Sequence, residues 1–196
     1  MKKLILITAC IFTVALKSSV AGNKPMVSNG LFVDMGFGFP NPPGYPGIDY
    51  SRGTSITFDI GNKFIFYKTL EDQLGIGMNA TWITLGFGSS EGYGSFYIKP
   101  MRIGPNGTYA FNDEMAIDAF LDFMPTFVFN GTFDSGDDVY VDHGVLIVPG
   151  ARFRYKVFSA GFEVAAGSLN KDNLDDESDY GSSSIVEPRI TLGFKF

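Results

Sequence analysis

Apolar and polar residues alternate along much of the chain beyond residue 30. Between 115 and 131, for example, Ile117, Leu121 and Phe123 occupy odd positions, whereas Asp118 and Asp122 occupy even ones. Successive side chains of a β-strand point to opposite faces, so this period of two predicts strands with one apolar and one polar face. Strands are predicted at 30–39, 53–67, 73–87, 94–111, 115–131, 143–156, 158–168 and 184–196.

The segments between the predicted strands alternate between long and short. Long connections are expected at 40–52, 89–93, 134–143 and 169–183, and short ones at 68–72, 112–114 and 156–157. An even number of strands with short turns at one end and longer loops at the other is typical of outer-membrane barrels. We therefore predict an all-β fold, an eight-stranded antiparallel up-and-down transmembrane β-barrel. A barrel of ten strands is the alternative prediction, if the fourth and fifth strands contain extra turns at 105–107 or 130–131.

The polar face of the predicted strands carries many of their charged residues. In a membrane barrel these side chains point inward, and an eight-stranded lumen is just filled by side chains. Buried charges require partners, so we expect an interior network of ion pairs without a wide pore. A narrow proton or ion path is the functional alternative, and a soluble sandwich with a solvated polar face is the structural one. The predicted inward residues are Asp34, Asp59, Asp118, Asp122, Glu163, Glu187, Lys63, Arg152, Arg154 and Arg189.

Two pairings inside this network follow from the strand order. Asp118 or Asp122 is expected to face Arg152 or Arg154 on the next strand, and Asp34 is expected to offer a counter-charge to Arg189 where the last strand closes on the first. In the second strand Ser55, Thr57, Asp59, Lys63 and Tyr67 are assigned to the polar face.

Aromatic residues are expected to gather at both ends of the barrel, as in the interfacial girdles of membrane proteins. The girdle by the short turns would comprise Tyr67, Tyr109, Phe111, Tyr155, Phe158 and Phe196. The girdle by the long loops would include Phe39, Phe87, Phe96, Phe129, Phe133 and Trp82, the last placed near the loop end of its strand. In the fourth strand Pro100, Arg102, Pro105 and Gly107 interrupt the alternation, which predicts a bulge or an earlier break in this strand.

The first residues have the pattern of a secretory signal peptide. A basic start is followed by an apolar stretch from Leu4 to Leu16 and by a small-residue cleavage site that ends at Ala21. We predict a signal peptide at 1–21 and a barrel domain at 22–196. Cys10 is the chain's single cysteine and loosely suggests a lipoprotein site, but lipidation there would leave apolar residues 11–16 at the mature N-terminus. An exported chain without cysteine has neither a disulfide framework nor a thiol nucleophile.

Charge and composition narrow the choice of partners. The formal net charge of −6 falls to about −9 without the three lysines of the signal peptide, which argues against a nucleic-acid partner. Twenty Phe, nine Tyr and 24 Gly agree with an all-β chain. The acidic runs at 134–142 and 172–179 lack the spacing of an EF-hand, and we interpret them as solvated loops rather than divalent-cation sites. No metal, cofactor-binding or catalytic residue is assigned, and no cofactor is expected.

The chain closes on a strand in which Ile190, Leu192, Phe194 and Phe196 share one face. This ending resembles the C-terminal signal that the barrel-assembly machinery of bacteria reads. Together with the signal peptide, the eight strands and the polar lumen, the mature chain resembles the OmpA/OmpX-type small outer-membrane barrels. The resemblance implies a cell outer membrane location, contact with outer-membrane lipids and lipopolysaccharide, and a structural or surface-interaction role through external loops that could hold an extracellular ligand. Without a domain after Phe196, it implies no peptidoglycan-binding role.

An enzyme is the rival class, since some eight-stranded barrels resemble lipid A-modifying enzymes. Such an enzyme needs a histidine positioned by an acid and acting on a serine. The single histidine, His143, lies beside Asp142 and lacks a serine two residues away, although Ser135 or Ser168 could reach it in the fold. We therefore predict no enzymatic activity, with a lipid A-modifying enzyme using His143 or a narrow porin-like channel as the alternatives.

Overall fold

The computed structural model describes residues 26–41, 53–69, 71–90, 93–132, 139–173 and 179–196. The predicted signal peptide, Phe133 and parts of the predicted loops lie outside these residues. The described residues form eight strands: β1 (Gly30–Gly38), β2 (Thr54–Lys68), β3 (Leu74–Ser90), β4 (Tyr93–Ala110), β5 (Met115–Thr132), β6 (Val139–Tyr155), β7 (Phe158–Asn173) and β8 (Asp179–Lys195). No helix in the described ranges is long and apolar enough to cross a membrane.

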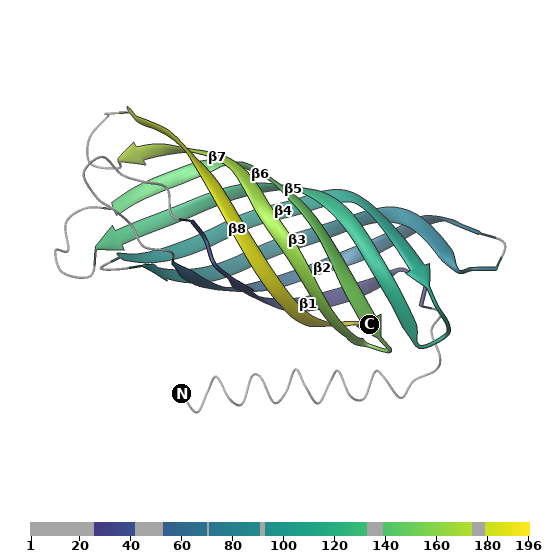
Figure 1. Cartoon of the computed structure of the whole chain (residues 1–196). Helices are drawn as coiled ribbons and strands as arrows, with labels where there is room; N and C mark the ends of the chain where they lie inside the picture. Colours follow the sequence, from purple (N-terminus) through teal and green to yellow (C-terminus); the bar gives the residue numbers. More distant parts are fainter. Residues whose placement is uncertain (1–25, 42–52, 70, 91–92, 133–138, 174–178) are drawn as a thin grey trace, which may run out of the picture.

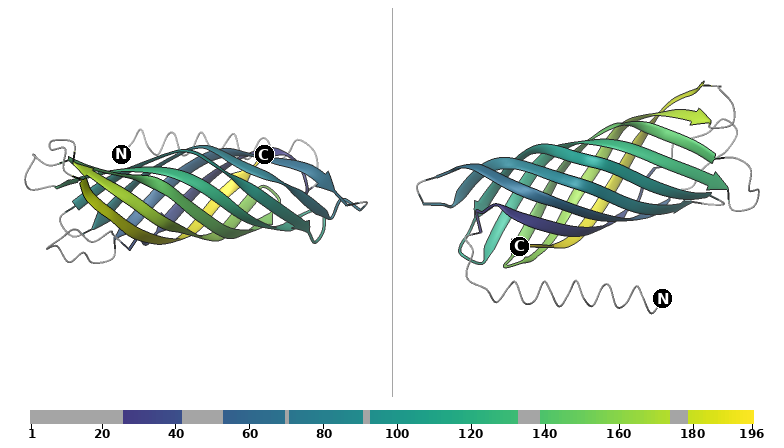
Figure 2. Two further views of the ribbon diagram at one scale, coloured as in Figure 1. Left: turned by 90° about the horizontal axis from the view of Figure 1, so that it is seen from above. Right: turned by 180° about the vertical axis from the view of Figure 1, so that it is seen from behind.

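The eight strands close into one antiparallel barrel in chain order (Figures 1 and 2). Each strand pairs with its sequence neighbours, and β8 pairs with β1 from Phe32↔Lys195 to Gly38↔Arg189. The eight-stranded prediction is confirmed. The ten-stranded alternative is wrong, because β4 runs unbroken through 105–107 and β5 through 130–131.

The tilt of the strands follows from the pairing around the ring. Eight cross-strand pairs lead from Leu31 of β1 around the ring to Asn41, which follows the end of β1 and lies ten residues further along the chain. The pairs are Leu31↔Asn62, Asn62↔Ala80, Ala80↔Ile103, Ile103↔Phe123, Phe123↔Ile147, Ile147↔Ala166, Ala166↔Val186 and Val186↔Asn41. With a rise of about 3.3 Å per residue and a strand spacing of about 4.8 Å, this shift tilts the strands by about 40°. A barrel of these dimensions has a lumen that side chains can fill.

The barrel is polar inside and apolar outside. On β5, Leu121 is 42% exposed while its neighbour Asp122 is 1% exposed, and the same alternation runs through β2. A water-soluble barrel or sandwich has the opposite polarity, because it buries its apolar side chains. The fold is therefore a transmembrane β-barrel, and the soluble sandwich is excluded.

Strands β3 and β4 each contain an extra residue at the same level. Trp82 and Met101 lie opposite each other there, and Met101 has a φ of 52°. The inserted residue reverses the parity of the strand, so that Lys99 and Arg102 both face the lumen although three positions separate them. The bulge predicted in the fourth strand is confirmed, and it explains why a single alternation could not be followed there.

A second bulge alters the end of β2. Ile65 pairs with Gly77 and Tyr67 with Ile76, so Phe66 is an extra residue and the side chains of Phe66 and Tyr67 are both exposed. The assignment of Tyr67 to the polar face was wrong, because parity cannot be continued through a bulge. Its assignment to the girdle by the short turns agrees with its position.

Two aromatic zones lie at the predicted ends of the apolar surface. On the loop side Phe87, Phe96 and Phe129 are paired across three strands, with ring centroids 5.1 and 6.4 Å apart. On the turn side Tyr109 and Phe111 make an edge contact at 5.3 Å. Thirteen residues separate Phe96 from Tyr109 on β4, which corresponds to about 30 Å along the barrel axis at the tilt given above. This distance matches an apolar band of about 25 Å with a girdle at each edge.

Trp82 does not belong to the loop-side girdle. It lies eight residues from either end of β3, at the bulge, and its Nε1 donates a hydrogen bond of 2.8 Å to Asn62 Oδ1 on the outer face of β2. The prediction failed because β3 continues to Ser90, three residues beyond the predicted end. The indole instead satisfies an amide that faces the lipid.

The strands extend further on the loop side than the alternation indicated. β6 begins at Val139, β7 ends at Asn173 and β8 begins at Asp179, so residues 139–143, 169–173 and 179–183, which were predicted as loop, belong to strands. The connection expected at 89–93 is a two-residue link between β3 and β4, as short as the turn at 156–157, and the strict alternation of long and short connections is therefore wrong. β3–β8 have 16 to 18 residues, more than the 9 to 11 that cross a bilayer, so they continue beyond the apolar band.

Candidate functional site: the charged lumen

The lumen is packed with buried charged side chains from every strand except β3, which has no charged residue. All ten residues that the alternation placed inside are at most 8% exposed, and five further charged residues join them. The added residues are Lys99, Arg102, Asp142, Lys171 and Lys195.

Arg102 is the hub of the central layer. Its Nε donates to Asp122 Oδ2 at 2.6 Å, and its two terminal nitrogens donate to the two oxygens of Glu163 at 3.1 and 2.7 Å. The guanidinium also lies over the ring of Phe120, 5.1 Å from its centroid. Such a forked contact holds two carboxylates with one cation, and charge-assisted bonds of this kind are the ones that make buried charges tolerable.

A second group of charges lies further toward the loop side. Lys99 Nζ is 3.4 Å from Glu187 Oε2, and Ser55 Oγ donates to Glu187 Oε1 at 2.6 Å. Arg189 bridges this group to the central layer, with Nε 3.4 Å from Glu163 and 3.8 Å from Glu187. The backbone of β1 leaves room for this group, since a Cβ at Gly38 would lie 2.5 Å from the Glu187 carboxylate and 2.9 Å from Arg189.

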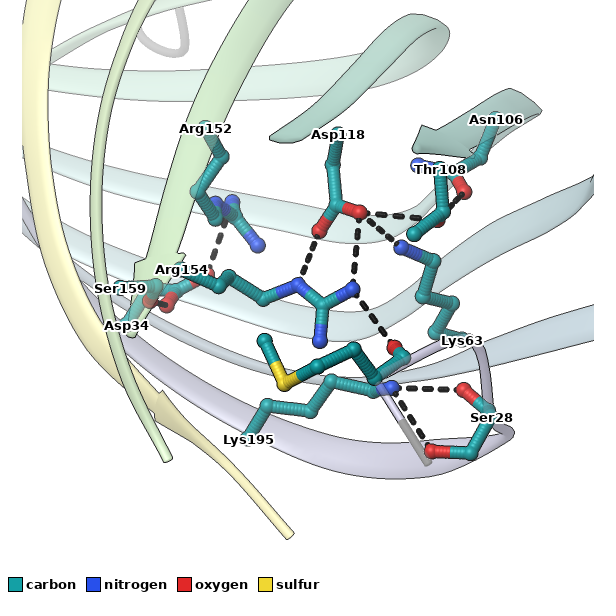
Figure 3. A network of polar contacts seen from close by, with 11 residues as sticks. Ser28, Asp34, Lys63, Asn106, Thr108, Asp118, Arg152, Arg154, Ser159 and Lys195 are labelled. Atoms are coloured by element: carbon teal, nitrogen blue, oxygen red, sulfur yellow. Dashed lines mark hydrogen bonds and ion pairs between the residues drawn. The ribbon is translucent and has the colours of Figure 1, made fainter. Parts of the chain in front are cut away.

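The turn-side group is centred on Asp118 (Figure 3). Its carboxylate accepts from Arg154 Nε at 2.7 Å and Nη2 at 3.1 Å, from Lys63 Nζ at 2.5 Å, and from Thr108 Oγ1 at 2.8 Å. One buried carboxylate is thus shared by two cations and a hydroxyl. These contacts come from four strands, so the group ties β2, β4, β5 and β6 together across the lumen.

Arg152 connects the turn-side group to β1. Its Nη2 lies 2.8 Å from Asp34 Oδ2, and its guanidinium is held between the rings of Phe32 and Phe120, each centroid 5.4 Å away. Asp34 is directly opposite Asp59 in the β1–β2 pairing. Like charges in this position repel each other, and the Arg152 cation compensates the repulsion.

Not all of the lumen is polar. Toward the loop side eight buried residues from β4 to β8 form an apolar cluster inside the barrel: Tyr97, Met124, Val128, Leu146, Val148, Ala165, Leu169 and Ile185. Tyr97 packs against the backbone of Gly88, where a Cβ would lie 2.6 Å from the phenol oxygen. Side-chain packing therefore closes this part of the lumen as a small hydrophobic core would.

The turn-side mouth is filled by the segment before β1. Met26 and Val27 are 6% and 1% exposed and pack with Ala110 and Ala116 inside the barrel. Arg154 Nη2 donates to the Met26 carbonyl at 2.9 Å, and Lys195 Nζ donates to the Ser28 carbonyl at 2.6 Å. A cavity of about 10 Å³, which is at most the size of one water molecule, lies behind this segment.

One of the two predicted pairings is confirmed and the other is wrong. Asp118 does pair with Arg154, but Asp122 pairs with Arg102. Asp34 pairs with Arg152 rather than Arg189, whose partners are Glu163 and Glu187. Long side chains reach across a narrow lumen to strands that are not neighbours, so strand adjacency alone does not select the partner.

Sequence reasoning missed Phe32 and Phe120, although parity with Asp34 and Asp118 would have placed both inside. It also missed the segment before β1, for which no periodic signal exists. Asp142 was assigned to a solvated loop, but it is 1% exposed and accepts a hydrogen bond of 3.0 Å from Asn130 Nδ2. The remaining members of the acidic runs lie outside the part of the chain whose side chains are described.

His143 lies on the outer face of β6, opposite Asn170 of β7, and its ring stacks on Phe127 with centroids 6.5 Å apart. Its neighbour Asp142 points into the lumen, so the two side chains lie on opposite faces. Ser168 pairs with Val145, the next outward position, which makes it a diagonal neighbour of His143. Ser135 lies outside the described residues. The predicted alternative of a histidine positioned by the adjacent acid is not supported, because that acid faces away.

Comparisons with known proteins give distant likenesses to membrane barrels. No protein-family model and no curated protein matches the chain. Among solved structures, Ail, the attachment invasion locus protein of Yersinia pestis, matches with 10% identity and a TM-score of 0.47 over 86% of this chain and 97% of that one. The translocator domain of the autotransporter NalP from Neisseria meningitidis matches with 8% identity and a TM-score of 0.42 over 99% and 98%. A designed transmembrane β-barrel matches with 12% identity and a TM-score of 0.38 over 88% and 98%. At this level no residue role carries over from them.

Proposed function

We propose that the protein is a small barrel of a bacterial outer membrane that acts as a structural envelope component or through its loop-side surface, and not as a wide pore or an enzyme. The observation that carries this proposal is the filled lumen. Arg102, Arg189 and their carboxylate partners occupy its central layer, and an apolar cluster occupies its loop-side part. A porin needs an aqueous channel, which requires many more strands than eight.

The loop side supports a surface role. The strands β3–β8 continue past the aromatic row Phe87–Phe96–Phe129, so a rim of strand ends extends beyond the apolar band. In an outer membrane with the turns toward the periplasm, this rim and the loops it carries face the outside of the cell. An extracellular ligand would meet these parts first. Contact with outer-membrane lipids is expected along the apolar band, and the assembly machinery would read the β8 strand.

Purified protein in planar bilayers tests the filled lumen. We expect no conductance steps of the size of a porin, since side chains of the described residues occupy the central layer and the loop-side part of the lumen. Heat-modifiable migration of the outer-membrane fraction on a detergent gel tests the location, because a folded barrel migrates differently from its boiled form. Stable porin-sized steps, or recovery of the protein in a soluble fraction without a gel shift, would contradict the proposal.

A histidine variant tests the proposal that the protein is not an enzyme. His143→Asn removes the imidazole but keeps a polar side chain beside Phe127. We expect the lipid A of cells expressing this variant to have the same acyl chains, by mass spectrometry, as that of cells expressing the parent protein. A parent-specific change in acylation that disappears with His143→Asn would establish the enzyme instead.

A further inference from the structure

The segment Met26–Asn29 enters the lumen rather than continuing β1 outside it. Val27 packs against Gly75 and Ile65 at the turn-side end of β2 and β3, where a Cβ on Gly75 would lie 2.4 Å from a Val27 methyl group. Asn29 Oδ1 accepts a hydrogen bond of 2.6 Å from the Ile65 backbone N–H. The four residues therefore lie across the mouth that the short turns surround.

The barrel holds this segment mainly through its backbone oxygens. Arg154 donates to the Met26 carbonyl and Lys195 to the Ser28 carbonyl, while the Ser28 hydroxyl adds a longer contact of 3.3 Å to Lys195 (Figure 3). Both donors are cationic and almost completely buried, and hydrogen bonds from charged donors are the stronger ones. Asp118 orients the Arg154 guanidinium with two bonds, so the ion-pair network prepares the site for the segment.

A polar cavity lies directly behind the segment. Lys63, Asp118, Arg152, Arg154, Ser159 and Lys195 line it, together with two asparagines and the rings of Phe32 and Phe120. Arg154 and Lys195 belong both to the cavity wall and to the site that holds the segment. Displacing the four residues would thus expose a charged vestibule to the turn-side solvent.

The balance of forces allows such a displacement. Burial of Met26 and Val27 favours the closed position, but ordering four residues costs a free energy of the same order. The two charge-assisted hydrogen bonds and the Asn29 contact then decide the position. The rest of the barrel does not depend on these residues, because the strand pairing closes the ring without them.

From these contacts we propose that Met26–Asn29 is a plug that closes a charged vestibule in the turn-side half of the lumen and that can be displaced while the barrel stays folded. The proposal goes beyond the proposed function and does not depend on what the loop side binds. The central layer around Arg102 remains in place when the plug leaves, so an open plug gives access to the vestibule and not a wide pore.

A cysteine reporter in the vestibule tests the plug. Ser159→Cys places a thiol in the cavity wall with little change in volume, and Cys10→Ser makes it the single cysteine of the full-length chain. The exported protein is folded in detergent micelles and treated with a charged methanethiosulfonate reagent. With the plug in place we expect slow labelling, at least 100-fold slower than at Asp113→Cys, an exposed position on the β4–β5 turn that sets the rate of full access.

Val27→Asp in the reporter chain places a charge against Ala110 and Ala116 and should displace the plug. We expect labelling of Ser159→Cys to become at least tenfold faster. Ser28→Ala is the matched control: it removes only the hydroxyl contact of 3.3 Å and keeps the carbonyl that Lys195 binds, so labelling should stay slow. Heat-modifiable migration verifies that each variant is folded, and Val27→Gly replaces Val27→Asp if the latter does not fold.

Two results would overturn the plug. Labelling of Ser159→Cys at the rate of the exposed turn position in the otherwise unchanged chain would show that the vestibule is already open. Unchanged slow labelling in a folded Val27 variant would show that the segment does not control access.

Discussion

The inner and outer faces of the same strands solve opposite problems. On the outside, Leu121 and its neighbours contact lipid with exposed apolar side chains that need no specific partner. On the inside, Asp122 one residue later is tied to Arg102 by a bond of 2.6 Å and belongs to a network that reaches β8. The outer face therefore depends on polarity alone, whereas the inner face depends on which residue meets which. Mutations on the two faces should therefore differ in how much stability they remove, in whether the loss depends on depth in the membrane, and in which second mutations restore it.

The largest effect is expected from Arg102→Ala. The change leaves Asp122 buried without its cation, leaves Glu163 with only the longer contact to Arg189, and removes the contact with Phe120. Removing one partner of a buried ion pair costs about 3–5 kcal/mol of unfolding free energy. Urea titration of the protein in lipid vesicles measures it, with Trp82 as the chain's single tryptophan reporting transfer from lipid to water.

The control for Arg102→Ala is its rescue. Adding Asp122→Asn and Glu163→Gln to a chain with Arg102→Met removes the unpaired charges, and most of the lost stability should return. A triple variant as unstable as Arg102→Ala would mean that the packing around Phe120, and not the charge balance, determines the cost.

A smaller effect, which depends on depth, is expected on the outer face. Leu121→Arg places a charge in the middle of the apolar band and should cost about 2–4 kcal/mol. Ile117→Arg, four residues nearer to the turns, should cost clearly less, because the cation reaches the interface. The same urea titration compares the two variants. Equal costs would contradict the position of the band between the two aromatic zones.

The contrast between the faces also explains how much the sequence could predict. The alternation of apolar and polar residues predicts the polarity of each face, and the ten residues assigned to the lumen are buried. The alternation does not predict which charged residues pair, since Asp34 pairs with Arg152 from β6 although Arg189 lies on the adjacent β8. Which side chains can reach each other across a lumen of eight strands depends on the tilt of the strands and on the shift between them. Both depend on the register of all eight strand pairs, which the sequence of a single strand does not reveal.

Local irregularities set the other limit. The bulges at Trp82, Met101 and Phe66 reverse parity, so Lys99 and Arg102 could not both be assigned to the lumen from one alternation. The plug segment has too few residues to show any period. Both features place residues at the candidate site, Arg102 at its centre and Met26 at its mouth. Periodic parts of the fold, including ten charged residues of the lumen, were therefore predictable, whereas the residues that the bulges and the segment before β1 add to the interior were not.

The smallest effect on stability is expected for an ion pair on the short turns, which belongs neither to the lumen nor to the lipid-facing surface. Lys156 and Glu114 form a pair of 3.2 Å with both side chains 53% exposed, and the hydrogen bond to Glu114 raises the pKa of Lys156 above its usual value. A raised pKa in the folded state adds stability at pH values below the pKa of an unfolded lysine, about 10.4, and this contribution is lost as the pH rises through the folded value. Because solvent screens the pair, Lys156→Met should leave the urea midpoint unchanged at pH 7, and parent and variant should also coincide above pH 11. A midpoint shift at pH 7 as large as that of Arg102→Ala would show that ion pairs stabilise this barrel equally whether they are buried or exposed. The expected difference between the buried lumen pairs and the exposed turn pair would then be wrong.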